Sequence, residues 1–353
     1  MATSTTENCP SIMSTEEEIP QSYTAADLLQ RVASYIESCE YDLARTFCLR
    51  ALDLEPENVH VLEMLGQVEA ELGMFEEAVS RFQRAIQLEP NKGYSKYLYL
   101  GQLSTALESI AYYRRGVELL VEERSRMPES SEEALAHARK ISSALCSMTE
   151  IYLTDCCFEP DAEQKCEEFL SQAASIDPEN PEVYQLLASV RLSQCRNEEA
   201  QQAIEKSMDL WIQKEPGHPS IPQYDSRIAL TKLLLEMSLH ERAMTVLGGL
   251  QKENDQSVDL WYLYGWTYNC MMEEATDPEA KRELMDDMRE CLENAIKLYH
   301  QLDHDDEPIL EHCQELLSTL PPAEGNTAEE EEEDGAEDED QWEDEEDDDA
   351  MEM

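Results

Sequence analysis

Hydrophobic and small residues recur along this chain at an interval of 34 positions. Gly66, Ala78 and Phe82 lead to Pro90, and another proline, Pro56, precedes Pro90 by 34 residues. Apolar residues three or four positions apart predict amphipathic helices, and the small residues let two such helices pack closely. Because proline cannot continue a helix, Pro56 and Pro90 mark the ends of second helices. The pattern therefore predicts a stack of helical hairpins.

Aligning other segments on this unit predicts seven hairpins and a final helix. Three neighbouring pairs of hairpins are predicted to start 34 residues apart. The third unit is irregular, with a long second helix, and another long helix is predicted from a capping box at Ser130 to about Phe158. Proline and glycine predict a loop over residues 214–223, and Asp277–Pro278 predicts a helix start. The hairpins should start near residues 25, 59, 94, 147, 181, 224 and 258, and residues 308–317 should cover the last one.

The repeat resembles the tetratricopeptide repeat over about residues 25–303. The resemblance implies an all-α superhelical solenoid over residues 24–320, with about seven hairpins plus a capping helix. In such solenoids the first helix of each hairpin lines a concave groove, whose usual function is to hold another polypeptide. Residues 1–23 and 321–353 lack a sustained apolar period and are predicted to be a disordered N-terminus and a disordered acidic tail.

The charge of the chain narrows the choice of partner. The chain has 79 Asp and Glu against 26 Lys and Arg, a net charge of -53. Of these acids 19 lie in residues 321–353, which contain no Lys or Arg. Nucleic acids and anionic membranes both select basic surfaces, so we expect no direct binding to either. The acidity instead predicts a basic protein client, bound by a chain that is monomeric beforehand.

No arrangement of residues predicts catalysis. Histidines and cysteines lack the spacing of zinc or redox sites, and neither a phosphate-binding loop nor a nucleophile elbow is present. We therefore expect no enzymatic activity, no cofactor and no metal. The odd number of cysteines, 11, and the polar N-terminus favour free thiols in a reducing compartment. This predicts a location in the cytoplasm and nucleus.

Repeat positions 2, 5, 9, 12 and 13 point into the groove of a tetratricopeptide solenoid, and here they are mostly acidic. Lys232 is the one base among them. Repeat proteins that grip the carboxylate tails of heat-shock chaperones carry bases at these positions, so that role is not expected. Any single acid can be an ordinary solvated side chain, but the nearly uniform sign favours binding of a basic segment. The predicted lining consists of Glu63, Gln67, Glu71, Asp155, Glu159, Glu182, Gln185, Asp225, Glu236, Asp259, Tyr262, Trp266 and Asn269.

Two runs in the irregular third unit carry a narrower resemblance. They are KYLYLGQL at residues 96–103 and AYYRRGVELL at residues 111–120. Together with the acidic tail, they make the chain similar to the dedicated assembly chaperones of the large-subunit ribosomal protein uL4 (L4). The resemblance implies a basic client loop that the solenoid holds until the client, brought to the nucleus, joins the large ribosomal subunit. Acidic groove residues would stand in for the phosphates of ribosomal RNA, and the tail would raise the local negative charge.

Charge alone leaves two other functions open. A histone chaperone would also combine helical repeats with an acidic segment, and the charge argument does not separate the two clients. A scaffold or adaptor for another basic protein would use the same repeats, with acids that only keep the chain soluble. Histones in a pull-down would favour the first alternative, and binding that persists at about 0.5 M salt would favour the second, because screened ion pairs would then contribute little.

Overall fold

The computed structural model describes residues 23–321, and every regular element in this range is an α-helix. The predicted all-α fold class is therefore confirmed for the described residues. The predictions for residues 1–22 and for the acidic tail from residue 322 lie outside them. The helices form two compact units, residues 23–253 and residues 254–321. Their arrangement as one continuous solenoid over residues 24–320 stays a prediction.

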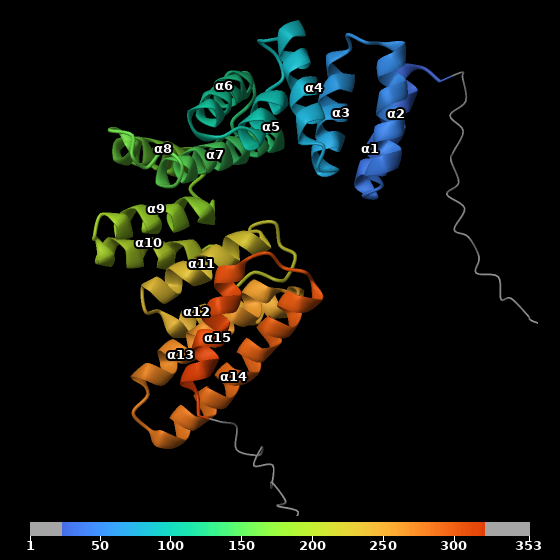
Figure 1. The fold of residues 1–353 in the computed structure, drawn as a ribbon. Coiled ribbons are helices and arrows are strands. Elements are labelled where there is room, and N and C mark those ends of the chain that lie inside the picture. Colours follow the sequence, from blue (N-terminus) through green and yellow to red (C-terminus); the bar gives the residue numbers. More distant parts are fainter. Residues whose placement is uncertain (1–22, 322–353) are drawn as a thin grey trace, which may run out of the picture. The chain divides into compact units, whose positions relative to one another are not determined.

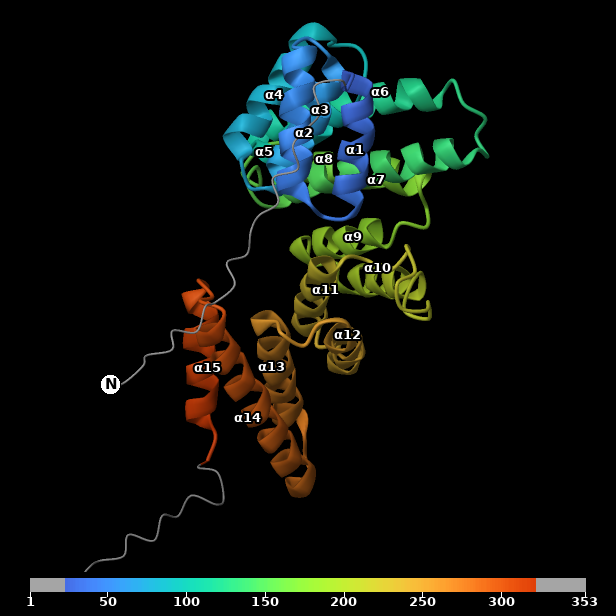
Figure 2. The same cartoon turned by 90° about the vertical axis from the view of Figure 1, so that its right-hand side faces the viewer.

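The first unit consists of six consecutive hairpins (Figure 1). The predicted starts near 25, 59, 94, 181 and 224 agree with helix starts within one residue, because local periodicity and capping set them. Figure 2 shows the α6–α7 connection standing out from the other hairpins of this unit. In chain order the helices are α1 (Ala25–Glu37), α2 (Tyr41–Leu54), α3 (Val59–Glu71), α4 (Phe75–Leu88), α5 (Ser95–Leu103), α6 (Ala106–Arg124), α7 (Glu132–Leu153), α8 (Ala162–Ile176), α9 (Pro181–Ser193), α10 (Asn197–Asp209), α11 (Tyr224–Glu236) and α12 (His240–Glu253).

The second unit is a long hairpin closed by a third helix. It contains α13 (Val258–Glu274), α14 (Pro278–Gln301) and α15 (Glu307–Thr319). The side chain of Asp277 accepts a hydrogen bond from the backbone N–H of Ala280, and Pro278 opens α14 as predicted. Helix α15 packs on both α13 and α14, and its apolar face is buried. The predicted capping helix is thus present, because an exposed apolar edge of the last hairpin needs a cover.

Helix α7 differs from its prediction at both ends. Its N-cap is Ser131, one residue later than predicted, and the Ser131 hydroxyl accepts a hydrogen bond from the N–H of Ala134 at 3.1 Å. The helix ends at Leu153 and not near Phe158. Pro160 disfavours helical backbone in the residue before it, and a turn over residues 154–161 leads into α8. The same helix spans residue 147, where the fourth hairpin was expected to start.

Glycines allow close helix contacts inside the hairpins. A Cβ atom at Gly66 of α3 would lie 2.9 Å from the ring of Phe82 on α4. In the irregular third hairpin, a Cβ atom at Gly101 of α5 would lie 2.8 Å from the ring of Tyr113 on α6. Both separations are shorter than van der Waals contact. Phe82 and Tyr113 therefore fill the same kind of gap, although Tyr113 follows its glycine at a shorter interval, mainly because α5 ends sooner after Gly101 than α3 does after Gly66.

A side-chain donor ties the first helix of several hairpins to the loop before it. The Tyr97 hydroxyl donates to the carbonyl of Pro90 at 2.9 Å, and the Tyr184 hydroxyl donates to the carbonyl of Pro178 at 2.9 Å. These bonds satisfy loop carbonyls that no helix satisfies and fix how each first helix leaves the loop before it. The same link is made by Arg227 to Pro222 at 2.9 Å and by Trp261 to Asp255 at 2.7 Å.

Candidate functional site

Three pairs of first helices from successive hairpins lie beside one another in the first unit. Helix α3 neighbours α5, α7 neighbours α9, and α9 neighbours α11. This is the arrangement on which the predicted groove depends, because side chains from neighbouring first helices then share one face. The structure brings some of the predicted lining residues together on this face and gives others a structural partner.

Glu63 on α3 forms an ion pair inside the first unit. Its Oε1 lies 2.9 Å from Nζ of Lys96 on α5, and the Lys96 side chain is fully buried. Lys96 Nζ also donates to the carbonyl of Lys92. A buried ammonium group needs such a partner, so Glu63 stabilises the α3–α5 contact. Its negative charge is already matched before any client arrives.

A second charged network shows how acids of the first unit are matched internally. The carboxylate of Glu69 is fully buried, 3.5 Å from Arg45 Nε and 3.2 Å from Arg81 Nε. Glu167 pairs with Arg191 between α8 and α9. Removing one member of a buried network leaves an uncompensated charge, so Glu69 is part of the fold, while the half-buried Glu167 has its charge matched by Arg191. The net charge of the chain therefore overstates the charge that is available to a partner.

The α7–α9 face, formed by Glu150, Glu182 and Gln185, has acidic groups without a matching base among the hydrogen bonds and ion pairs of the described residues. Glu150 is exposed over much of its surface, but partial burial and the nearby Glu182 carboxylate both raise its pKa. Burial also raises the pKa of the Cys146 thiol, and the charges of Glu182 and Glu150 add to that effect. These groups therefore lie close enough to influence one another, and a cation placed between the two carboxylates would be favoured.

Gln185 completes this face with an unused acceptor. Its Nε2 donates to the carbonyl of Ser226 on α11 at 3.0 Å. Its Oε1 is buried and accepts no hydrogen bond within residues 23–321. Glu182 meanwhile accepts a hydrogen bond from the Ser226 hydroxyl at 3.1 Å. A buried acceptor without a donor is costly, so an incoming N–H group would be stabilised here.

Glu150 was not among the predicted lining residues. The repeat alignment started the fourth hairpin at residue 147, which put Glu150 outside the five groove positions. In the structure Cys146 and Glu150 stand one helical turn apart on the long helix α7. The four-residue spacing of Cys146 and Glu150 in the sequence already predicts one shared helix face. The sequence did not give the register of α7, so this face could not be assigned to the groove.

Asp155 and Glu159 do not lie on a first helix, which corrects their predicted position. Helix α7 has already ended at Leu153, and both residues are exposed on the turn over residues 154–161. Burial is the largest cause of the raised pKa of the Cys156 thiol, and the carboxylates of Glu159 and Asp155 raise that pKa further. They therefore belong to the turn that joins α7 to α8 at one end of the hairpin.

In the second unit, α15 covers part of the predicted lining. The Tyr262 side chain is buried, its hydroxyl lies 2.8 Å from Nδ1 of His312 on α15, and burial raises its pKa to about 12. The half-buried Trp266 packs edge-on against the same His312 ring. Tyr262 therefore belongs to the contact between α13 and its covering helix and is closed to a client. Asp259 and Asn269 are half-buried on α13.

The remaining predicted residues are accessible to different degrees. Gln67 is half-buried, whereas Glu71, Asp225 and Glu236 are exposed. Glu71 raises the pKa of Tyr99 on α5, in addition to the larger effect of burial. The Tyr99 ring in turn stacks on Phe82 with centroids 5.1 Å apart. Glu71 is thus an exposed acid of α3 close to the Tyr99 ring of α5.

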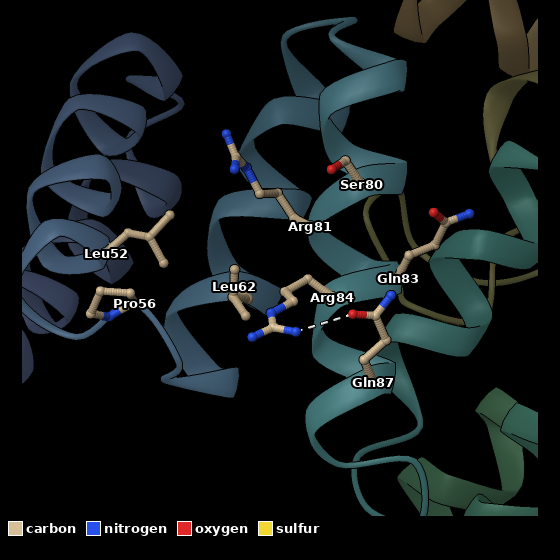
Figure 3. Close-up of a pocket in the computed structure, with 8 residues that line it drawn as sticks. All are labelled: Leu52, Pro56, Leu62, Ser80, Arg81, Gln83, Arg84 and Gln87. Atoms are coloured by element: carbon tan, nitrogen blue, oxygen red, sulfur yellow. Dashed lines mark hydrogen bonds between the residues drawn. The ribbon is translucent and has the colours of Figure 1, made fainter.

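A hollow of about 410 Å³ lies among α2, α3 and α4 (Figure 3). Its polar wall includes Arg81 and Arg84. Both bases have acidic partners, because Arg81 pairs with Glu69 and Arg84 Nη2 lies 3.1 Å from Glu57. The hollow is therefore a packing gap between hairpins with its charges already matched, and it has none of the free acceptors of the α7–α9 face.

The described residues form neither a metal-binding group nor a membrane-spanning helix. Within residues 23–321, no three His, Cys, Asp or Glu side chains are grouped so that they could hold a metal ion. No helix in the same range is long and apolar enough to cross a membrane.

Comparison with known proteins identifies relatives over most of the chain. The tetratricopeptide repeat family matches residues 59–92, which is the second predicted repeat. The chain is 36% identical over 314 residues to a Schizosaccharomyces pombe protein described as "Probable assembly chaperone of rpl4", with 85% of this chain and 91% of the relative covered. A protein of the same description from Emericella nidulans is 32% identical over 319 residues, covering 83% of this chain and 80% of the relative.

Solved structures agree with these relatives. The structure of "Assembly Chaperone of RpL4 (Acl4)" has a TM-score of 0.65 and 32% sequence identity, and the match covers 71% of this chain and 98% of that chain. A tetratricopeptide repeat protein from Parabacteroides merdae has a TM-score of 0.51 at 11% identity, covering 83% of this chain and 98% of its own. At that identity the second match supports the fold alone. The predicted tetratricopeptide fold is thereby confirmed.

Proposed function

This chain belongs to the family of assembly chaperones of rpl4, and we propose that it binds newly made ribosomal protein L4 through the α7–α9 face and other exposed acids of its first helices. It is a dedicated chaperone of L4 in the assembly of the large ribosomal subunit. The repeat fold supplies a surface for a polypeptide and needs no chemical step. Its action is binding and release.

The observation that carries the choice of surface is the set of acceptors on the α7–α9 face. Burial and the Glu182 carboxylate raise the pKa of Glu150, and Gln185 Oε1 has no donor in the described residues. A Lys or Arg side chain of the client would neutralise the first pair and donate to the third group. Charge-assisted hydrogen bonds of this kind are stronger than neutral ones. The face therefore favours a basic segment over a neutral or acidic one.

Release follows from the same electrostatics. Contacts between accessible charges are individually weak and are screened by salt. They speed association more than they lengthen the lifetime of the complex. Ribosomal RNA, with one charge per phosphate, would compete for the same basic side chains. Binding in the cytoplasm, release in the nucleus and a monomeric chaperone before binding complete the proposal.

The test is a binding titration of recombinant L4 with the purified full-length chain. The double variant Glu150→Gln/Glu182→Gln removes both carboxylates while keeping their shape. We expect its affinity for L4 at low salt to fall about tenfold, or about 1.4 kcal/mol, and the salt dependence to become weaker. Core histones serve as a second basic ligand, and the wild-type chain should prefer L4.

The matched control is Glu76→Gln/Glu198→Gln. These two acids are exposed on the second helices α4 and α10, so the net charge changes by the same amount on another face. Equal loss of L4 affinity in both double variants would mean that only total charge matters. Unchanged affinity in Glu150→Gln/Glu182→Gln, with wild-type binding intact, would move the L4 site to another surface.

A further inference from the structure

The turn between α7 and α8, residues 154–161, presents an aromatic ring to solvent. The Phe158 side chain is 96% exposed. The other exposed large hydrophobic residues of the described range are between 44% and 56% exposed, so each still rests partly on a neighbour. Single exposed apolar residues are common on protein surfaces, but a phenyl ring that contacts almost nothing is free to receive a partner.

The exposure of Phe158 follows from a tightly bonded turn. The backbone N–H of Cys156 donates to the carbonyl of Ile151 at 2.8 Å, and the N–H of Glu159 donates to the carbonyl of Cys156 at 3.1 Å. The Cys156 side chain is only 4% exposed and belongs to a hydrophobic core cluster of the first unit. The buried Cys156 side chain and the hydrogen bonds within the turn therefore fix the backbone of the turn. A turn with a fixed backbone loses little backbone entropy when its aromatic residue binds.

Acidic residues precede and follow Phe158 along the turn. Asp155, Glu159 and Asp161 are exposed on the same turn, and the nearest base on α8, Lys165, is already paired with Glu168 at 2.8 Å. A neutral apolar partner would gain nothing from these charges. An arginine side chain would use both features, because guanidinium stacks on aromatic faces and pairs with carboxylates.

We propose that the turn over residues 154–161 is a second contact for the client, in which the Phe158 ring stacks on an arginine guanidinium that pairs with Asp155 or Glu159. This inference rests on the proposed function, since it takes the client to be a basic protein. It adds a residue that distinguishes arginine from lysine, which the α7–α9 face by itself does not do. The same turn explains why two predicted groove acids stand away from the first helices.

The experiment measures affinity for L4 and for two matched peptides. Phe158→Ala should weaken L4 binding by about threefold to thirtyfold, the range expected for loss of a cation–π contact. Phe158→Trp should keep or strengthen binding, and Phe158→Leu, which keeps apolar volume without a ring, should behave like alanine. Of two octapeptides that alternate glycine with arginine or with lysine, the wild-type chain should prefer the arginine peptide. Phe158→Ala should abolish that preference.

Phe75→Ala is the matched control. Phe75 is 56% exposed at the start of α4, also between the two helices of a hairpin, and is followed by Glu76 and Glu77. It should leave L4 affinity unchanged. Because the Phe158 side chain makes almost no contacts, the Phe158 variants should unfold at the wild-type temperature, which confirms that binding alone has changed.

Three results would overturn the inference while leaving the proposed function in place. They are unchanged L4 affinity in Phe158→Ala, full binding by Phe158→Leu, and an equal loss in Phe75→Ala. Failure of the wild-type chain to bind L4 would instead contradict the proposed function itself. The two failures are therefore distinguishable in one set of titrations.

Discussion

At the scale of single residues, glycine positions decide how closely the helices of a hairpin approach. Gly66 has Phe82 against it, whereas Gly249 of α12 would have no atom within 4 Å of an added Cβ. Both glycines lie inside helices, so both carry the usual entropic cost of glycine there. Packing alone distinguishes them.

Gly66→Ala should therefore lower the free energy of unfolding by about 1–3 kcal/mol, because the added methyl group overlaps the fully buried Phe82 ring. Gly249→Ala, made as its control, should instead raise it by up to about 1 kcal/mol, the difference in helix propensity. Urea unfolding followed by circular dichroism measures both. A stabilising Gly66→Ala would show that the Phe82 ring can move aside.

At the scale of elements, four hairpins share one turn. The residue after the first helix's C-cap has a positive φ: Cys39 (59°), Gly73 (74°), Cys195 (58°) and Ser238 (56°). The next residue then donates back across the turn, as in the 2.8 Å bond from the N–H of Leu239 to the carbonyl of Leu234. This is the Schellman motif, in which glycine is the preferred residue. Of these four positions, only position 73 carries glycine, the residue that this backbone favours.

Ser238→Gly should raise the free energy of unfolding by about 1 kcal/mol, because the left-handed backbone is strained for a residue with a Cβ atom. Gly73→Ala at the equivalent turn should lower it by a similar amount. Thermal unfolding of both variants at one pH measures the pair. A Ser238→Gly variant less stable than wild type would mean that lost hydrogen bonding or unfolded-state entropy outweighs the strain.

At the scale of the whole molecule, the acids divide into those that hold the fold and those left for a client. Glu63 and Glu69 have internal basic partners, whereas Glu150 faces another carboxylate and has a raised pKa. A carboxyl group with a raised pKa in the folded state destabilises the fold at pH values above that pKa, and this cost disappears as the pH falls through it. Surfaces that bind at the expense of stability are common in proteins.

Glu150→Gln should therefore stabilise the folded chain at neutral pH while it weakens L4 binding. The stability difference from wild type should shrink as the pH falls toward the acid range, where Glu150 becomes protonated. The affinity of the wild-type chain for L4 should fall over the same range, and that of Glu150→Gln should change less. Melting temperatures and L4 titrations between about pH 4.5 and 7.5 measure both effects. Loss of stability at neutral pH would assign Glu150 a structural role.

The candidate site was only partly predictable from the sequence. Glu182 and Gln185 were placed on the right helix, because α9 begins at its predicted residue and keeps the consensus register. Glu150 was missed and Asp155 was misplaced, because the length of α7 depends on packing of Cys156 and on Pro160 and not on the repeat. The Tyr262 side chain is covered by α15, where its hydroxyl contacts His312, 50 residues further along the chain. Local sequence could not predict this contact.

The sequence by itself determined the helix starts outside α7, the 34-residue spacing from α1 to α3 and from α11 to α13, and the closing helix α15. These depend on local periodicity, on capping residues and on proline, all of which act over a few residues. Tertiary structure decided which acids remain available to a client. Pairs such as Glu63 with Lys96, 33 residues apart, form only when neighbouring hairpins stack, and charge neutralisation acts through space, whatever the distance along the chain.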